Sequence, residues 1–241
     1  LAIKGTVEML AKKGKHVITC VTEHKAIIDT CKYLENKGLA EVTWLEVAKN
    51  GLITPEQVAD AIRDDTVLIS IMAANNEIGS IHPIKEIGSI AHERGVWFHT
   101  DATQAVAKIP FDVQDLNVDM ASLSAHKMYG PKGVGALYVR RRSPRVRLSP
   151  QMHGGGHERG MRSGTLNVPG IVGLGAACKI AKDDFEKDQA HYKALRERLE
   201  QKIRGALDHV ELNGDEVHRL PTTFNISFAY VEGESLIMGI P

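Results

Sequence analysis

The sequence predicts an α/β protein in which a mostly parallel sheet lies between two layers of helices (a three-layer α/β/α arrangement), followed by part of a smaller α+β domain. Two observations support this. Short apolar runs alternate with helical patterns as far as residue 139, which is typical of a parallel sheet covered on both faces. Near Ile171 the alternation stops and a long helical pattern begins. We therefore assign residues 1–170 to a large domain and residues 171–241 to a long helical segment with a truncated small domain.

Each predicted strand is an apolar run, and helical patterns separate most of the runs. The runs occupy residues 16–21, 41–47, 67–74, 96–100, 119–125 and 134–139. Apolar residues at helical spacing cover residues 1–14, 24–38, 54–65 and 83–95. The third helix has the clearest start, because Thr54 is a cap, Pro55 takes the first helical position and Gln57 completes a capping box. Beyond the large domain we expect one long or two abutting helices over 171–203 and an alternating strand pattern over 222–230.

The composition is that of an ordinary soluble globular protein. Apolar residues make up 43% and charged residues 25% of the 241 residues, so a sizeable core can form. The 30 basic and 30 acidic residues balance, so no net field attracts nucleic acid or an anionic membrane. No apolar run approaches membrane-spanning length, and no signal-peptide pattern opens the sequence. We therefore expect neither a nucleic-acid nor a membrane partner.

The three cysteines, Cys20, Cys31 and Cys178, are odd in number and widely spaced. This favours a reducing compartment over a disulfide framework or a zinc site. Cys20 falls in a strand and the other two on apolar faces of helices, where free cysteine acts as a small hydrophobe. We interpret all three as structural. No metal is expected, since His157 and Glu158 match no metal-ligand spacing.

Polar and ionisable residues follow four of the predicted strands, at the point where each strand ends. They are Thr22-Glu23-His24, Asn75-Asn76-Glu77, Asp101-Ala102-Thr103-Gln104 and His126-Lys127. Ligands of open α/β sheets bind at the carboxyl ends of the strands. We therefore expect these residues to converge on one site.

A lysine, an aspartate, histidines and amides at one rim suit pyridoxal 5'-phosphate (PLP). A lysine nucleophile forms a Schiff base with a carbonyl group. The PLP ring nitrogen takes a carboxylate partner, and the phosphate takes hydroxyls, backbone N–H groups and a helix N-terminus. Lys127, in the stretch SAHKMYGPKG, is the candidate nucleophile. The alternative is an exposed lysine on a Gly-Pro turn.

Five stretches resemble the cysteine desulfurase family: EHKAIIDTC, NNEIG, HTDATQAVAKIP, SAHKMYGPKGVGALYVRRR and QMHGGGHERGMRSGTLNVPGIVG. That family belongs to the class V aminotransferase branch of the fold-type I PLP enzymes. The similarity is closest to the housekeeping iron–sulfur type and runs over essentially the whole chain. The resemblance implies a PLP-dependent-transferase-like fold in which residues 1–170 form the PLP-binding domain.

The resemblance also assigns roles to individual residues. Lys127 would hold PLP as a Schiff base and move the substrate α-proton, while His24 would stack on the ring and assist proton transfer. Asp101 would pair with the pyridinium nitrogen, and Gln104 would bind the phenolic oxygen. The remaining cofactor-binding positions are Ser124 and His126 at the phosphate, Asn76 at the substrate or the phenolic oxygen, and Thr165 at the phosphate of a neighbouring subunit. Thr165 thereby implies a homodimer with shared sites.

The reaction implied by the resemblance converts L-cysteine to L-alanine. A mobile enzyme cysteine takes up the sulfur as a persulfide and passes it to an acceptor, such as an iron–sulfur scaffold protein. The compartment implied is the bacterial cytoplasm or, alternatively, the mitochondrial matrix.

Three parts of the family pattern are not found in these 241 residues, and one of them is the arginine of the C-terminal domain that binds the substrate carboxylate. The persulfide-forming cysteine lies in a Ser-Ser-Gly-Ser-Ala-Cys loop expected shortly after ESLIM, and a phosphate-binding turn is expected just before Leu1. We therefore expect a fragment that lacks both ends and is inactive alone. Two alternatives stay open: a selenocysteine lyase or other class V PLP enzyme, and a non-catalytic binding or dimerisation module.

One strongly basic run, RRRSPRVR, spans Arg140–Arg147. Its purely structural interpretation is a solvated turn at a sheet edge. Its functional interpretation is a docking surface for an acidic protein partner. Binding of nucleic acid is disfavoured, because no aromatic residues interleave with the arginines.

Overall fold

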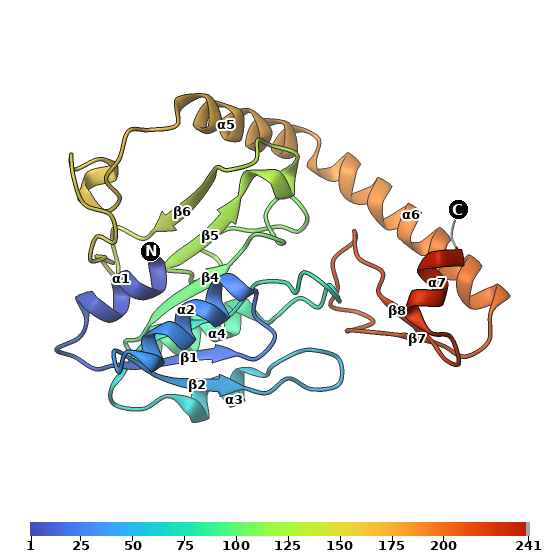
Figure 1. Cartoon of the computed structure of the whole chain (residues 1–241), viewed down its shortest axis with the longest axis horizontal. Helices are drawn as coiled ribbons and strands as arrows, with labels where there is room; N and C mark the ends of the chain where they lie inside the picture. The colour runs from blue at the N-terminus through green and yellow to red at the C-terminus, as the bar shows by residue number, and fades with distance from the viewer. Residues whose placement is uncertain (240–241) are drawn as a thin grey trace.

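A six-stranded sheet with helices on both faces forms the centre of the computed structural model, which describes residues 1–239 (Figure 1). The strand order is β2-β1-β3-β4-β5-β6. The first five strands are parallel, and β6 runs antiparallel to β5. Their bounds are β1 His16–Cys20, β2 Glu41–Leu45, β3 Thr66–Ser70, β4 Trp97–Asp101, β5 Met120–Ser124 and β6 Gly135–Val139. The predicted α/β class and mostly parallel sheet are confirmed.

Four helices cover the two faces of the sheet. They are α1 (Ala2–Met9), α2 (Lys25–Asn36), α3 (Pro55–Ala61) and α4 (Ile84–Glu93). Helices α1 and α2 pack with Val17 of β1 in one buried cluster, whereas α3 and α4 pack with Ile18 in another. Successive strand residues point to opposite faces, so each strand contributes to both clusters. The predicted capping box at Thr54 is present, with Gln57 N donating to Thr54 Oγ1 at 3.2 Å.

The predicted strand over 67–74 is shorter than expected, because β3 ends at Ser70. The chain nevertheless stays beside β4. Ile71 N donates to His99 O at 3.1 Å, and Ala73 N donates to Asp101 O at 2.9 Å. The backbone therefore reaches the edge of the sheet in an extended form.

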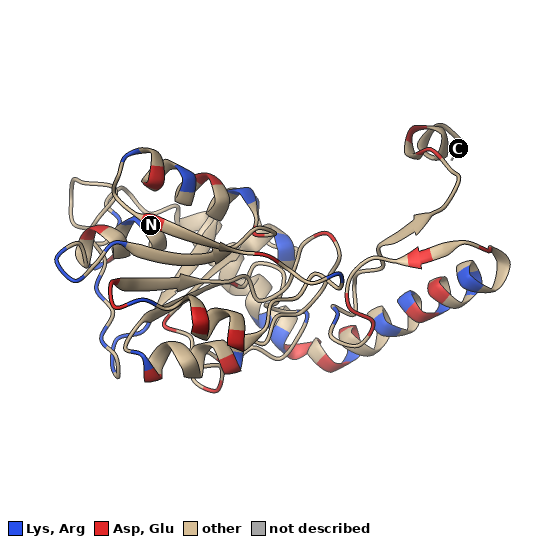
Figure 2. Cartoon of the chain, turned by 90° about the horizontal axis from the view of Figure 1, so that it is seen from below, with Lys and Arg blue, Asp and Glu red and all other residues tan. Residues whose placement is uncertain are grey.

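The C-terminal part is built from α5 (Val168–Asp183), α6 (Phe185–Ala206), β7 (Val210–Leu212), β8 (Ile226–Phe228) and α7 (Gly233–Gly239). The expected helix over 171–203 is two helices that meet at Asp184. The strand expected over 222–230 is the short β8, and its partner β7 was not predicted. The β7–β8 hairpin and α7 stand apart from the sheet, and α6 carries charges of both signs along its length (Figure 2). The proposed boundary at residue 170 falls inside α5 and stays a prediction.

The three cysteines have different surroundings. Cys20 and Cys31 are buried, as expected. The expectation for Cys178 is wrong, because its side chain is exposed on α5. Most of α5 is uncovered in the described chain, including the apolar residues Val168, Ile171, Val172 and Ile180. None of the described helices has both the length and the apolar character needed to cross a membrane.

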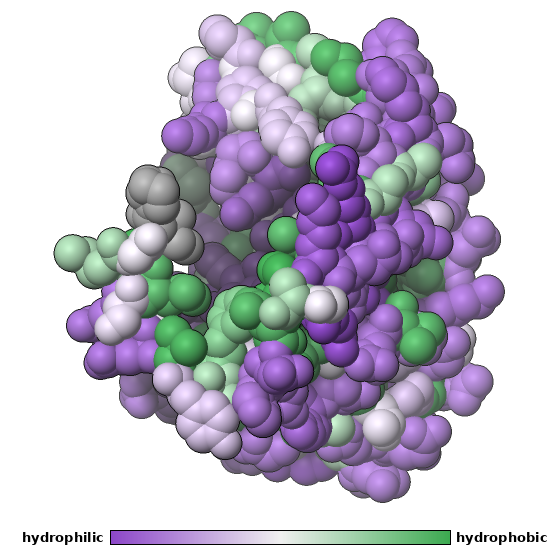
Figure 3. All heavy atoms as spheres, turned by 90° about the vertical axis from the view of Figure 1, so that its right-hand side faces the viewer, coloured by the Kyte–Doolittle hydropathy of each residue, from purple (hydrophilic) through white to green (hydrophobic). Residues whose placement is uncertain are grey.

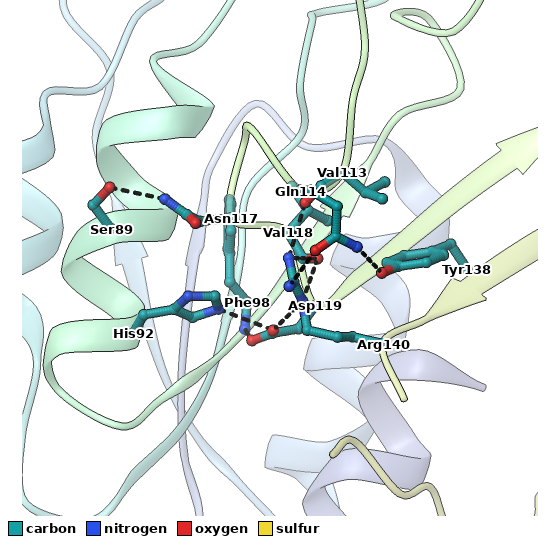
Figure 4. Close-up of polar contacts among 10 residues, drawn as sticks. All are labelled: Ser89, His92, Phe98, Val113, Gln114, Asn117, Val118, Asp119, Tyr138 and Arg140. Carbon is teal, nitrogen blue, oxygen red and sulfur yellow. Dashed lines mark hydrogen bonds and ion pairs between the residues drawn. The ribbon is translucent and has the colours of Figure 1, made fainter. Parts of the chain in front are cut away.

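A buried carboxylate joins α4 to three strands (Figure 4). Asp119 is fully buried and accepts hydrogen bonds from Phe98 N at 3.0 Å and from His92 Nε2 at 2.9 Å. Its Oδ1 lies 3.2 Å from Nε of Arg140, the residue that follows β6. The guanidinium also donates to the carbonyl oxygens of Val113 and Val118. Every charge in this cluster therefore has a partner, as burial requires.

Arg140 consequently does not belong to a surface basic run, because its side chain is only 7% exposed. Four other arginines of the run are exposed: Arg141, Arg142, Arg145 and Arg147. They border a hollow of about 1520 Å³ beside β6. The two interpretations of the run, solvated turn or docking surface, now concern these four residues alone.

We expect Asp119→Asn to destabilise the protein by about 3–5 kcal/mol, because it leaves the buried Arg140 charge unpaired. Equilibrium unfolding in urea measures the change. Arg141→Gln is the matched control and should alter stability by no more than about 0.5 kcal/mol, since this neighbour is exposed. Equal unfolding midpoints for Asp119→Asn and the unaltered protein would contradict a structural role for the cluster.

Candidate active site

The candidate site lies at the edge of the sheet where the parallel strands end. Strands β1, β3, β4 and β5 all point to this side (Figure 1). Viewed from the same side, the surface has a hollow lined mainly by hydrophilic residues (Figure 3). The strand order reverses here, since β1 leads to β2 on one side and β3 lies on the other. Such a switch point is where open α/β sheets bind ligands.

His24 and Asn76 flank this switch point. His24 is the N-cap of α2, directly after β1, and its Nδ1 accepts from Ala26 N at 3.2 Å. Asn76 is exposed in the turn that follows β3. Its neighbour Asn75 shapes that turn, because Asn75 Oδ1 accepts from Ile78 N at 3.0 Å. Both predicted site residues are thus presented on short connections tied to the sheet.

Asp101 and Gln104 occupy the connection after β4. Asp101 is the last residue of the strand, and its Oδ1 accepts from Thr103 N at 2.9 Å. Gln104 Oε1 accepts a hydrogen bond from Lys108 Nζ. A carboxylate and an amide therefore lie within one turn of each other beside the switch point.

Ser124, His126 and Lys127 follow one another at the end of β5. Ser124 ends the strand, and its Oγ lies 2.7 Å from His126 Nδ1. The next residues form a single 3₁₀ turn, η1 (Ala125–Met128), which Tyr129 closes in a left-handed conformation at φ 62°. The turn presents His126 and Lys127 to solvent. A hydroxyl, an imidazole and a primary amine are thereby clustered at one strand end.

Lys127 shares a small cavity with a second amine. The cavity has a volume of about 110 Å³ and lies between η1, Lys108, α5 and α6. Burial lowers the pKa of Lys108, and the positive charge of Lys127 lowers it further. Lys108 therefore loses its proton more readily than an isolated lysine does.

Thr165 lies away from the other seven predicted residues within the same chain. It is exposed in the segment between η2 (Glu158–Gly160) and α5. The chain before η2 runs beside α1, where Ser149 N donates to Gly5 O at 3.0 Å. This is the side where the parallel strands begin (Figure 1). The structure thus gathers seven of the predicted residues at one edge and leaves the eighth elsewhere.

Glu23 is a site residue whose importance the sequence did not reveal. Its side chain is 5% exposed, and its Oε1 accepts from Met72 N at 2.5 Å. Its Oε2 is buried with no hydrogen-bond partner among the described residues. Burial raises the pKa of Glu23 to about 8, with the hydrogen bond from Met72 N lowering it in part and the negative charge of Asp101 adding to the rise. The one signal in the sequence is its position between a strand-like run and His24.

A row of polar side chains crosses the sheet just below the site. His99 Nδ1 lies 2.9 Å from Ser70 Oγ, and His99 Nε2 lies 2.8 Å from Ser122 Oγ. Thr19 Oγ1 extends the row by donating to Ser70 O at 2.8 Å. Burial lowers the pKa of His99 to about 4, so the ring is neutral near pH 7. Among residues 1–239, no group of three or more His, Cys, Asp or Glu side chains is arranged to hold a metal ion.

The fold and its edge lysine define an α/β protein with an amine-bearing site at the carboxyl edge of its parallel strands. The chain belongs to the class V aminotransferase family, whose family model matches residues 1–239. The chain is 58% identical over 240 residues to the cysteine desulfurase IscS of Anaeromyxobacter sp. (strain Fw109-5) and 56% identical to that of Pseudoalteromonas translucida (strain TAC 125). Each alignment covers the whole chain and 59% of the relative. The predicted resemblance to cysteine desulfurases is confirmed.

Two solved structures have the same fold. A NifS-like protein superposes with a TM-score of 0.90 at 39% identity, over 98% of this chain and 63% of its own. DndA from Streptomyces lividans superposes with a TM-score of 0.89 at 37% identity, over 98% of this chain and 66% of its own. The chain therefore spans about 60% of the length of the curated relatives it matches.

The buried titratable groups predict a stability maximum near pH 6.5. Glu23 titrates near 4.5 when unfolded and near 8 when folded, so unfolding becomes easier as pH rises through this window. His82 and His99 titrate near 6.5 when unfolded and near 4 when folded, so unfolding becomes easier as pH falls below 6.5. Thermal unfolding across this range should show a decline on both sides.

Glu23→Gln tests the alkaline side of this maximum. The amide keeps an acceptor for Met72 N but cannot ionise, so the variant should unfold at least about 2–4 °C above the unaltered protein at pH 8. The exposed Glu93→Gln is the control and should follow the unaltered protein. An unchanged alkaline decline in Glu23→Gln would assign that decline to another group.

Proposed function

We propose that this protein is the cofactor-binding part of a PLP-dependent cysteine desulfurase, which converts L-cysteine to L-alanine and delivers sulfur for iron–sulfur cluster and other sulfur-cofactor assembly. The observation that carries the proposal is Lys127, presented by a single turn at the end of β5 in a chain 58% identical to a cysteine desulfurase. We also propose that the sulfur passes to an acceptor protein. The bacterial cytoplasm stays the predicted compartment.

The side chains at this edge fit the groups of PLP. Bound PLP supplies an aldehyde that reacts with an amine and a ring that withdraws electrons from the reacting carbon. Lys127 offers the amine and can then move a proton at the substrate α-carbon. Asp101 offers a carboxylate that keeps a proton on a ring nitrogen. Ser124 and His126, 2.7 Å apart, offer hydroxyl and imidazole donors to a phosphate.

The other three edge residues complete the proposed binding set. His24 is exposed at the start of α2, where its flat ring can cover one face of the cofactor. Gln104 offers an amide to the phenolic oxygen. Asn76 offers an amide to the substrate or to the same oxygen. These assignments carry over residue by residue from the sequence resemblance.

We further propose a homodimer in which Thr165 serves the partner's site. Thr165 is far along the chain from η1, in the segment between η2 and α5, and the chain before η2 runs beside α1, where the strands begin. Helix α5, which follows it, exposes several apolar side chains such as Val172 at 65% or Ile180 at 62%. Large exposed apolar surfaces mark association sites.

Borohydride trapping tests the cofactor site. Incubation with PLP, reduction and peptide mass mapping should give one phosphopyridoxyl adduct, on Lys127. Lys127→Ala should abolish the adduct, whereas Lys108→Ala, which alters the second amine of the same cavity, should retain it. An adduct on Lys108 alone, or equal labelling of many surface lysines, would contradict the proposal.

Subunit mixing tests the shared site. Thr165→Ala should weaken PLP affinity by about tenfold, the effect of one charge-assisted hydrogen bond. Mixing unfolded and refolded Thr165→Ala and Lys127→Ala chains should restore ordinary affinity in a fraction of sites, because one mixed site has both residues intact. Absence of any high-affinity sites in the mixture would mean that Thr165 acts within its own chain or not at all.

A further inference from the structure

The two strands at the switch point part before their hydrogen bonds are complete. Beyond Ser70 the chain keeps its pairing with β4 through the amides of Ile71 and Ala73. The amide between them, Met72 N, therefore points the other way, toward β1. Beyond β1, however, Val21 N is still paired with Leu45 O of β2, and the chain then turns into α2. The last carbonyl of β1, Cys20 O, accepts from Glu23 N at 3.4 Å, and Met72 N bonds to no carbonyl of β1.

The side chain of Glu23 takes the place of the missing carbonyl. Its Oε1 accepts from Met72 N at 2.5 Å and lies 3.5 Å from Cys20 Sγ. A buried amide without an acceptor would cost the free energy of its lost hydration. Glu23 therefore closes the sheet at the point where the two strands separate.

Asn75 makes a second tie across the same gap, in the opposite direction. Its Nδ2 donates to Thr22 O at 3.1 Å, and its side chain is 6% exposed. Each tie is formed by the residue that directly precedes a predicted site residue: Glu23 precedes His24, and Asn75 precedes Asn76. The two connections that carry His24 and Asn76 are thus held to each other by buried side chains.

The surroundings of Glu23 favour its uncharged form. No lysine, arginine or histidine nitrogen of residues 1–239 lies within 4.0 Å of its carboxyl group, and its Oε2 has no partner. The titratable groups that face it are Cys20 of β1, Cys31 of α2 and Asp101 of β4. Burial raises the pKa of each of these thiols to about 12, so both are neutral. Asp101 is the one neighbour able to carry charge, and it repels a second carboxylate.

We propose that Glu23, assisted by Asn75, is a positioning residue that holds His24 and Asn76 at the carboxyl edge of the sheet. Its carboxyl group accepts from Met72 N as a neutral acid. Asp101 is then the single carboxylate charge beneath the site. Only the identity of the ligand that binds at this edge rests on the proposed function. The tie between the two connections exists in the cofactor-free chain and is measurable there.

Two substitutions of Glu23 separate its acceptor from its charge. Glu23→Gln keeps an acceptor for Met72 N and removes only the ionisable proton. Glu23→Met has a similar length without an acceptor, and its apolar end suits the neighbours Cys20, Cys31 and Met72. Amide hydrogen exchange of the cofactor-free protein, with peptides that cover residues 21–26 and 70–78, reports on the ties. PLP affinity from visible absorbance reports on the rim.

Glu23→Gln should keep both exchange protection and PLP affinity within about twofold of the unaltered protein. Glu23→Met should exchange about tenfold faster in both segments and bind PLP about tenfold more weakly, the effect of one lost hydrogen bond. Borohydride should still label Lys127 at saturating PLP. If Glu23→Met does not fold, Asn75→Asp, which removes the donor to Thr22 O but keeps the acceptor of the turn, decides by the same two measurements.

Two results would overturn the inference. Unchanged exchange and affinity in Glu23→Met would show that the tie positions nothing. Equal damage in Glu23→Gln and Glu23→Met would show that a charged carboxylate is required. Failure of the unaltered protein to form an adduct on Lys127 would instead refute the proposed function, and the exchange results would still decide the role of Glu23.

Discussion

The relative register of the four central strands depends on one row of buried and half-buried polar side chains. Thr19, Ser70, His99 and Ser122 link β1, β3, β4 and β5 in sequence across the sheet. A slip of one residue moves every side chain of a strand to the other face, and here it would leave buried polar groups unpaired. His99 and Ser122 each lie two residues before a predicted cofactor ligand, Asp101 and Ser124 respectively. The row therefore fixes the positions of Asp101 and Ser124 at the carboxyl edge of the sheet.

The Asp119 cluster has the complementary task of fixing the starting ends of β4 and β5. Asp119 begins the run into β5, and its partners come from α4, β4 and the residue after β6. One end of β5 is thus anchored by a paired charge, and the opposite end carries the Ser124–Lys127 turn. Rigid support of this kind is what a site built on strand ends requires.

Much of the sheet could be predicted from the sequence, because its determinants are local. Apolar runs, the Thr54 capping box and the change of pattern near Ile171 each lie within a few residues of the feature they specify. The errors have long-range causes. Arg140 looks like a surface residue until Asp119, 21 positions earlier, is placed beside it. Cys178 was expected on a covered helix face, which the described chain leaves open.

The candidate site was predictable to the extent that strand ends reveal it. Six of its residues follow apolar runs within four positions, Ser124 lies near the end of such a run, and the family resemblance gave each a role. Glu23 was expected near the site but received no role, because its partner, Met72 N, is a backbone group 49 residues away, and backbone donors leave no signal in side-chain patterns. Lys108 escaped notice for a similar reason, since only the fold brings it to the cavity of Lys127.

The length of α6 has a mechanical consequence. Its 22 residues form a rod of about 33 Å that meets α5 at Asp184. A turn of about 5° at that joint moves its far end, and the β7–β8 hairpin with it, by about 3 Å. The segment that follows β7 is hydrogen-bonded to residues 79–81. Ile81 N donates to His218 O at 2.8 Å, and Leu220 N donates to Gly79 O at 2.9 Å. A change in the angle between α5 and α6 would therefore be transmitted to the turn that carries Asn76.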